Sequence, residues 1–225
     1  DAGITSFLAL RGDPPADGSP VSTSDLQSAA ELVQLIHRVQ QEREPYSQQL
    51  VRGGAPGATR LRARPRPERV AVAAFPNGHP RSRNEQQEID NLLAKEAAGA
   101  NLAITQLFYR ADDYLGFVER VRAGGVTMDI LPGIMPAVSA QRLRRIAQLT
   151  GEDAPDELAI SLEIEPSDAG REEIATAFFA DLANEVIAGG APGLHLYTLN
   201  KHEAVLAVLE RVNRFPASVS SKENA

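Results

Sequence analysis

The chain repeats one pattern five times: a short apolar segment, a turn rich in Gly, Pro and polar residues, and then an amphipathic stretch. The apolar segments lie at residues 6–11, 69–75, 102–109, 127–131 and 194–198. Strands that alternate with helices pair in parallel through right-handed crossovers. The pattern therefore predicts an α/β protein with a parallel sheet.

The stretches between these strands have the apolar spacing of helices. They cover residues 25–41, 82–98, 112–123, 139–150, 171–188 and 201–212. Ser24 is the expected N-cap of the first helix. Ser82 and Glu85 have the spacing of a capping box at the start of the second. Residues 151–170 are less regular and predict a short helix and a loop. The buried stripe of the first helix is expected to contain Leu26, Ala30, Leu32, Val33 and Ile36.

The amino-acid composition excludes several kinds of function and of chemical site. The chain has 23 basic and 30 acidic residues among 225, a net charge of −7, which argues against general nucleic-acid binding. It has no cysteine, so disulfides, thiolate catalysis and thiolate metal sites are excluded, and no metal site is predicted. The sequence shows no secretory signal and no apolar run near about 18 residues. We therefore expect a cytoplasmic protein without a membrane span.

Residues 43–69 interrupt the pattern. They contain seven arginines against Glu44 and Glu68, together with several Pro and Gly residues. The favoured interpretation is a mobile, solvated loop. The alternative is a basic patch for the anionic tail of a ligand. The Ser-rich, polar residues 216–225 are expected to form a flexible tail.

Polar groups stand at the strand tips, where parallel strands deliver side chains to one edge of a sheet. In chain order they include Arg11, Gly12, Asp13, Asn77, His79, Gln106 and Tyr197. Gln106 is the most informative, because a buried glutamine without a partner would cost about 1–3 kcal/mol. The pattern predicts one site assembled from several strand ends.

Five motifs occur in a characteristic order: Leu10–Asp13, Ala73–Pro80, Gly99–Tyr109, Pro132–Pro136 and Tyr197–Asn200. This order resembles the methylenetetrahydrofolate reductase family. The resemblance implies a TIM-type (βα)8 barrel, with one barrel domain over residues 1–215. The first motif resembles the end of the family's fourth strand. We therefore expect this chain to supply strands four to eight, with the family's catalytic glutamate lying in an absent N-terminal part.

The resemblance also implies a reaction. FAD would pass hydride from NADH or NADPH to 5,10-methylenetetrahydrofolate, giving 5-methyltetrahydrofolate. Asp13 and Gln106 would be the catalytic pair, with Asp13 opposing negative charge on the reduced flavin. The cofactor-binding residues would be Leu10, Arg11, Gly12, Asp13, Ala73, Phe75, His79, Asn91 and Lys95. The substrate-binding residues would be Gln106, Tyr197 and Lys201.

Two other functions stay open from the sequence. One is a non-catalytic subunit that binds folate or flavin. The other is a different flavin-dependent barrel oxidoreductase, such as a relative of proline dehydrogenase. The expected partners are a folate and a nicotinamide nucleotide, and self-association into a homo-oligomer is left open.

Overall fold

The computed structural model describes residues 6–10, 26–43, 46–50, 59–63, 69–79, 82, 84–200 and 202–213. It separates into two compact units, which are described one at a time. Unit 1 comprises residues 1–72 and 92–102, and unit 2 comprises residues 73–91 and 103–225.

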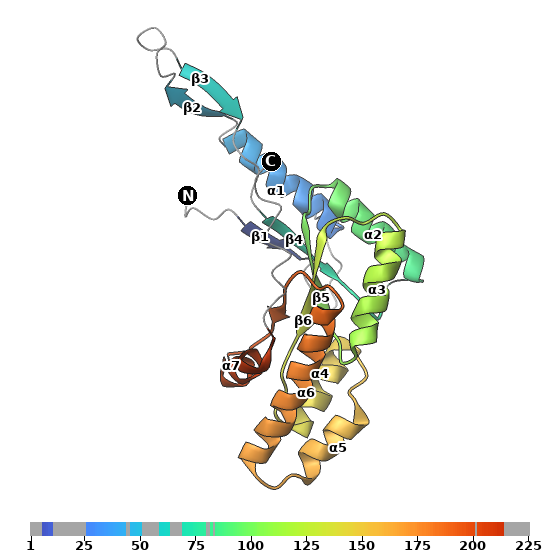
Figure 1. Ribbon diagram of the computed structural model, residues 1–225. Coiled ribbons are helices and arrows are strands. Elements are labelled where there is room, and N and C mark those ends of the chain that lie inside the picture. Colours follow the sequence, from blue (N-terminus) through green and yellow to red (C-terminus); the bar gives the residue numbers. More distant parts are fainter. Residues whose placement is uncertain are drawn as a thin grey trace, which may run out of the picture. The chain divides into compact units, whose positions relative to one another are not determined.

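Five strands form one sheet in the order β1-β4-β5-β6-β7. They are β1 (Ser6–Ala9), β4 (Arg69–Ala74), β5 (Leu102–Leu107), β6 (Asp129–Ile134) and β7 (His195–Leu196) (Figure 1). The pair β1 and β4 and the pair β6 and β7 are parallel. Each strand of this sheet lies beside the one before it in the chain. Doubly wound sheets reverse their order at a switch point, whereas barrels add strands in sequence.

Helices follow the strands as the sequence predicts. They are α1 (Ala29–Arg43), α2 (Glu85–Ala97), α3 (Ala111–Ala123), α4 (Ala140–Thr150), α5 (Asp156–Ile164), α6 (Asp168–Ala188) and α7 (His202–Arg211). The short helix expected within residues 151–170 is α5. The α/β class and the predicted alternation are confirmed.

Two predicted helix starts lie too early in the chain, and a third lies too late, because α6 begins at Asp168 after its N-cap Ser167 rather than at residue 171. The hydroxyl of Ser28 accepts from the Glu31 amide over 3.2 Å, so α1 begins at Ala29 and Leu26 is 41% exposed. The side chain of Asn84 accepts from the Gln87 amide over 3.0 Å, so α2 begins at Glu85 rather than at Ser82. At the starts of α1 and α2 a capping side chain further along the chain than predicted accepts from an amide of the first turn.

Within the predicted loop of residues 43–69, the structure describes two short strands. Strands β2 (Tyr46–Leu50) and β3 (Thr59–Ala63) pair antiparallel, with Tyr46 opposite Ala63. The period-two run Thr59–Ala63 alternates Arg with Leu or small residues, which is a strand pattern despite its charge.

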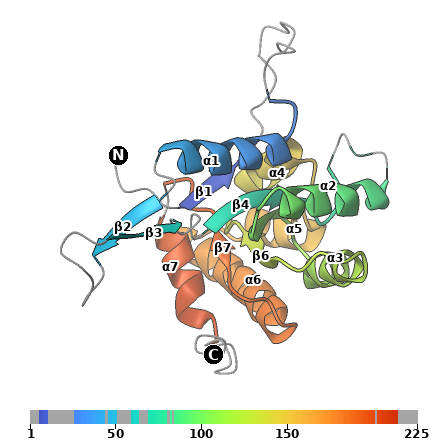
Figure 2. The same ribbon diagram turned by 90° about the horizontal axis from the view of Figure 1, so that it is seen from above.

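Unit 1 packs α1 beside β1 and β4 (Figure 2). Val33, Val70, Val72 and Leu92 are fully buried and form its apolar centre. Asn101 continues the pairing at the start of β4, because its side-chain oxygen accepts from the Val70 amide over 3.0 Å while its own amide donates to the Val70 carbonyl. Val70 and Val72 give β4 the apolar character expected of a parallel strand that is covered on both faces.

Unit 2 has an aromatic and aliphatic core. Phe108 and Tyr114 stack with ring centres 5.7 Å apart. The buried hydroxyl of Tyr114 donates to the Ile130 carbonyl over 2.8 Å, which ties α3 to β6. Phe179 of α6 is also fully buried. This polar bond inside an apolar core fixes the position of α3 along the sheet.

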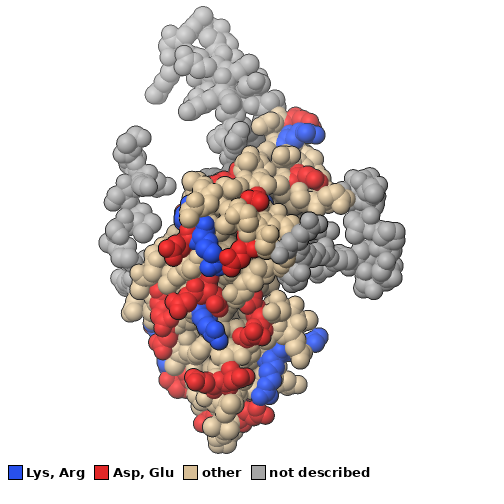
Figure 3. Space-filling model, turned by 90° about the vertical axis from the view of Figure 1, so that its right-hand side faces the viewer, with Lys and Arg blue, Asp and Glu red and all other residues tan. Residues whose placement is uncertain are grey.

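On the face shown in Figure 3, acidic side chains are more widespread than basic ones, in keeping with the net charge of −7. Within the described ranges, no helix combines the length and apolar character required to cross a bilayer.

Candidate functional site

The turn that follows β4 is the centre of the candidate site. The Gly78 amide donates to the Phe75 carbonyl over 3.1 Å, and the Ser82 amide donates to the His79 carbonyl over 2.8 Å. Gly78 has φ of +85°, a conformation that favours glycine. Two successive turns therefore reverse the chain between β4 and α2.

Phe75 and His79 lie on this turn with their rings in contact. The ring centres are 4.6 Å apart and the planes are nearly perpendicular, at 88°. Both residues are half-buried. An edge-to-face pair of this kind holds its geometry well, so the two rings present a defined wall to the adjacent space.

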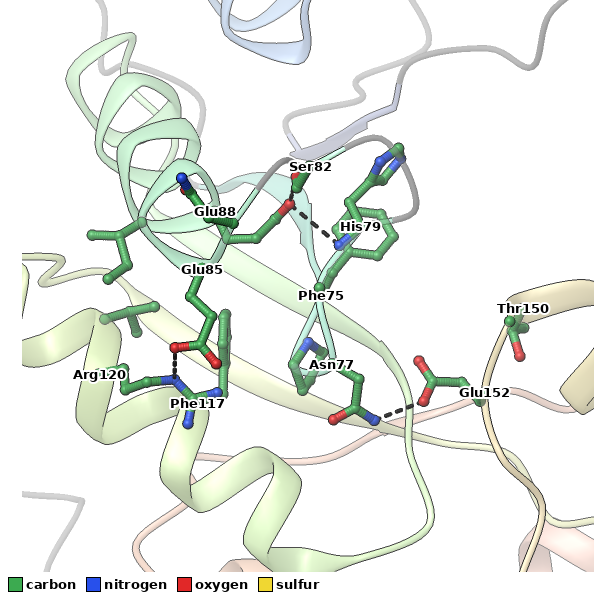
Figure 4. Close-up of a pocket in the computed structure, with 16 residues that line it drawn as sticks. Phe75, Asn77, His79, Ser82, Glu85, Glu88, Phe117, Arg120, Thr150 and Glu152 are labelled. Carbon is green, nitrogen blue, oxygen red and sulfur yellow. Dashed lines mark hydrogen bonds and ion pairs between the residues drawn. The ribbon is translucent and has the colours of Figure 1, made fainter.

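A buried carboxylate anchors the same loop. Glu88, in the first turn of α2, is 5% exposed. One of its oxygens accepts from the His79 amide over 3.3 Å and from the Ser82 hydroxyl (Figure 4). Because buried carboxylates require such partners, Glu88 fixes the loop to the start of α2.

These elements surround a cavity of 680 Å³. The loop, α2, α3 and the end of α4 all contribute to its wall (Figure 4). Its labelled lining residues are Phe75, Asn77, His79, Ser82, Glu85, Glu88, Phe117, Arg120, Thr150 and Glu152. The volume is in the usual range for small-molecule and cofactor sites.

Asn77 connects two sides of this cavity. Its side-chain nitrogen donates to Glu152 over 2.7 Å and lies 3.5 Å from a carboxylate oxygen of Asp113. Burial raises the pKa of Glu152 above its usual value, the hydrogen bond from Asn77 lowers it, and the charge of Asp113 raises it further. Burial, with the negative charge of Glu152, raises the pKa of Tyr109 to about 12.

The charged groups of the cavity wall are mostly acidic. Arg120 lies 3.8 Å from Glu85 in an ion pair whose side chains are 43% and 79% exposed. Exposed pairs of this kind contribute little to stability. Glu88 and Glu152 add further carboxylates, so the described lining does not form an anion-binding pocket.

A second group of predicted residues lies elsewhere in unit 2, around Thr105 of β5. Thr105 is fully buried. Its hydroxyl accepts from the Gly133 amide over 2.8 Å, and its carbonyl accepts from the Tyr197 hydroxyl over 3.1 Å. Gln106 follows it, half-buried, and its side-chain oxygen accepts from the Leu107 amide over 2.9 Å.

The structure thus brings together Phe75 and His79 but does not place Gln106 or Tyr197 in their cavity. Ala73 and Lys95 are half-buried, Asn91 is exposed, and Leu10 is 52% exposed. Arg11, Gly12, Asp13 and Lys201 lie outside the described residues.

Sequence reasoning placed Asn77 among the strand-tip groups without giving it a binding role, and it did not assign Arg120 or Glu152 to the site. Asn77 stands in a strand-tip motif, which was a usable signal. Glu152 is 75 positions further along the chain, and no local pattern links the two residues. Among the described side chains, no group of three or more His, Asp or Glu is arranged to hold a metal ion.

Comparisons with known proteins agree with the motif order. A family model described as methylenetetrahydrofolate reductase matches residues 66–213, a range that includes Phe75, His79, Gln106 and Tyr197. The chain is 30% identical over 92% of its length to the 5,10-methylenetetrahydrofolate reductase of Salmonella typhimurium. It is 30% identical over 92% of its length to a probable methylenetetrahydrofolate reductase (NADPH) of Caenorhabditis elegans. It is 29% identical over 94% to methylenetetrahydrofolate reductase 1 of Schizosaccharomyces pombe.

The chain spans 60% of the Salmonella relative, 28% of the nematode relative and 32% of the yeast relative. The family match covers the candidate cavity, and the strand order is that of part of a TIM-type barrel. The resemblance drawn from five motifs is therefore confirmed, and the chain belongs to the methylenetetrahydrofolate reductase family.

Proposed function

We propose that the protein reduces 5,10-methylenetetrahydrofolate to 5-methyltetrahydrofolate, with hydride supplied by NADH or NADPH through FAD. One observation carries the proposal beyond family membership. Phe75 and His79, which the resemblance assigns to the flavin site, meet ring to ring on the wall of one cavity. Two residues with the same expected partner thus share one space.

The cavity fits the ring system of a flavin better than it fits the phosphates. The paired rings and Phe117 offer a partly apolar wall, which suits a flat heterocycle. The negative charge of the lining carboxylates opposes binding of a pyrophosphate. Arg120, the one lysine or arginine among the described lining residues, is paired with Glu85. When bound, FAD supplies the hydride chemistry, and the protein's part is to hold and orient it. Phe75 and His79 are the described residues that would do so.

Gln106 would orient the folate. Its side-chain oxygen accepts from the Leu107 amide, so the amide NH2 is the group that it offers to a ligand. That group can donate to the carbonyl oxygen or a ring nitrogen of a pterin. Asp13 would oppose negative charge on reduced flavin and stabilise a cationic folate intermediate. Lys201 would complete the folate side, and Tyr197 would support it from the Thr105 carbonyl, to which its hydroxyl donates.

The test is a comparison of spectra and turnover. The purified full-length protein should acquire the visible absorption bands of flavin on incubation with FAD. NADH or NADPH should bleach these bands, and methylenetetrahydrofolate should restore them. A chain that binds neither flavin nor folate would overturn the proposal. Binding of either without turnover would favour the non-catalytic subunit.

A further inference from the structure

Tyr197 holds its hydroxyl inside the protein. The Tyr197 hydroxyl donates to the carbonyl of Thr105 over 3.1 Å, and the Tyr197 amide donates to the Ile134 carbonyl over 2.9 Å. His195 packs edge-on against the Tyr197 ring, with ring centres 4.5 Å apart. Backbone and ring are thus both held, which fixes the direction of the hydroxyl.

The carbonyl that accepts from the Tyr197 hydroxyl is important because of its place in the backbone. The Thr105 carbonyl belongs to the peptide plane that joins Thr105 to Gln106, and this plane is rigid. The side chain of Thr105 is held as well, because its buried hydroxyl accepts from the Gly133 amide over 2.8 Å. Thr105, Gly133 and Tyr197 together, here called the Thr105 brace, leave the backbone at Gln106 little freedom to rotate.

The close approach of β6 supports this interpretation. A Cβ on Gly133 would lie 2.3 Å from the Thr105 carbonyl oxygen and 2.9 Å from Cε2 of Tyr197. Only glycine allows β6 to come this near to the Thr105 carbonyl and to the Tyr197 ring. The brace is therefore a tightly packed contact between β5, β6 and the residue that follows β7.

We propose that Tyr197 is a positioning residue for Gln106, and that it acts through the Thr105 carbonyl rather than by contact with the ligand. Gln106 then presents only its amide NH2, because its oxygen is held by the Leu107 amide. This proposal rests on the proposed function, since it takes Gln106 as the folate-orienting group. It predicts specificity for a ligand that offers an acceptor atom at that point.

The matched test uses two tyrosines that each donate to a backbone carbonyl. Tyr197→Phe keeps the ring and removes the bond to Thr105. Tyr114→Phe removes the equivalent bond to Ile130, which lies outside the brace. Because Tyr197→Phe loses one hydrogen bond, its affinity for methylenetetrahydrofolate should be about threefold to tenfold lower than that of the parent chain. Tyr114→Phe should leave folate affinity unchanged, and both variants should retain the flavin spectrum of the parent chain.

A double-mutant cycle separates positioning from general loosening. In a Gln106→Ala background, Tyr197→Phe should have no further effect on the Kd for methylenetetrahydrofolate. An equal effect in both backgrounds, or unchanged folate binding by Tyr197→Phe alone, would overturn the proposal.

A second readout needs no ligand. The NMR signals of the Gln106 side-chain amide should shift in Tyr197→Phe and stay in place in Tyr114→Phe. If the parent chain fails to bind folate, the proposed function fails, while this signal still decides whether the brace controls Gln106. Unshifted Gln106 signals in Tyr197→Phe would rule the brace out.

Discussion

The side-chain amide of Asn77 donates a 2.7 Å hydrogen bond to Glu152 and so joins the turn after β4 to the segment after α4. The contact spans 75 positions of sequence and forms one side of the cavity that Phe75 and His79 line. A titratable group thus supports the wall of the candidate site, which makes the stability of this region dependent on pH.

Glu152→Gln should make the protein more stable at neutral pH. The pKa of Glu152 is raised in the fold, so the fold favours the protonated carboxyl. The protonated form of Glu152 makes its full contribution to stability below pH 4.5, the pKa of the unfolded chain. That contribution is lost as the pH rises through the raised pKa of the folded state. Glutamine keeps an acceptor for Asn77 without the charge. The advantage of the variant should grow from pH 4 to pH 7 by up to about 1 kcal/mol, measured by urea unfolding. An advantage that is constant or shrinks over that range would contradict the assignment.

Three tyrosines should resist ionisation in the folded protein, since burial also raises the pKa of Tyr197. Burial raises the pKa of Tyr109 and of Tyr114 to about 12. In the unfolded chain all three should titrate near about 10, so stability should fall as the pH rises above that value. The tyrosinate absorbance should appear in two phases for the native protein and in one phase in urea. Phenylalanine at any of these positions should reduce the later phase, and a single native phase would be inconsistent with these burial effects.

Gly133→Ala should destabilise the protein by about 1–3 kcal/mol. The added methyl group would meet the Thr105 carbonyl at 2.3 Å, and backbone atoms cannot move aside cheaply. The matched control is Gly116→Ala in α3, where a methyl would meet only the flexible end of Arg120 at 3.3 Å. Alanine there should stabilise the helix by roughly 0.5–1 kcal/mol. Chemical denaturation of the two variants measures the contrast, and equal effects would argue against the tight approach of β6.

Glu88 and Glu85 offer a second matched pair, both in the first turn of α2. Glu88→Ala leaves the Ser82 hydroxyl and the His79 amide without their buried acceptor, and should cost about 1–3 kcal/mol. Glu85→Ala removes an exposed ion pair with Arg120 and should change stability by less than about 0.5 kcal/mol. Thermal unfolding of both variants would reveal the difference. Similar losses would mean that the buried acceptor does not anchor the loop.

The order of elements could be predicted from the sequence because strand and helix periods differ locally. The exact helix starts could not, since Ser24 and Ser28, or Ser82 and Asn84, are all acceptable caps. Tertiary packing decides between such neighbours, and here it selected Ser28 and Asn84. The capping preference itself was a correct guide to the residue types.

The candidate site likewise contains residues that the sequence predicts and residue pairs that it does not. Phe75 and His79 were predicted together from the family resemblance, because both belong to the Ala73–Pro80 motif. The partnership of Asn77 with Glu152, and that of Thr105 with Tyr197, depends on contacts between distant segments. No periodicity or spacing encodes such pairs. The predicted roles of Asp13 and Lys201 remain predictions.

Strands β1 and β7 stand at the two ends of the strand order, so within the described residues each has a strand neighbour on one side. Leu8 within β1 and Leu10 just after it are 46% and 52% exposed. A strand at the end of a sheet, next to exposed apolar side chains, can act as a template to which a strand from another molecule adds. Concentrated preparations of this chain should therefore be prone to intermolecular sheet growth, and a charged residue in place of Leu8 would be the simplest safeguard against aggregation.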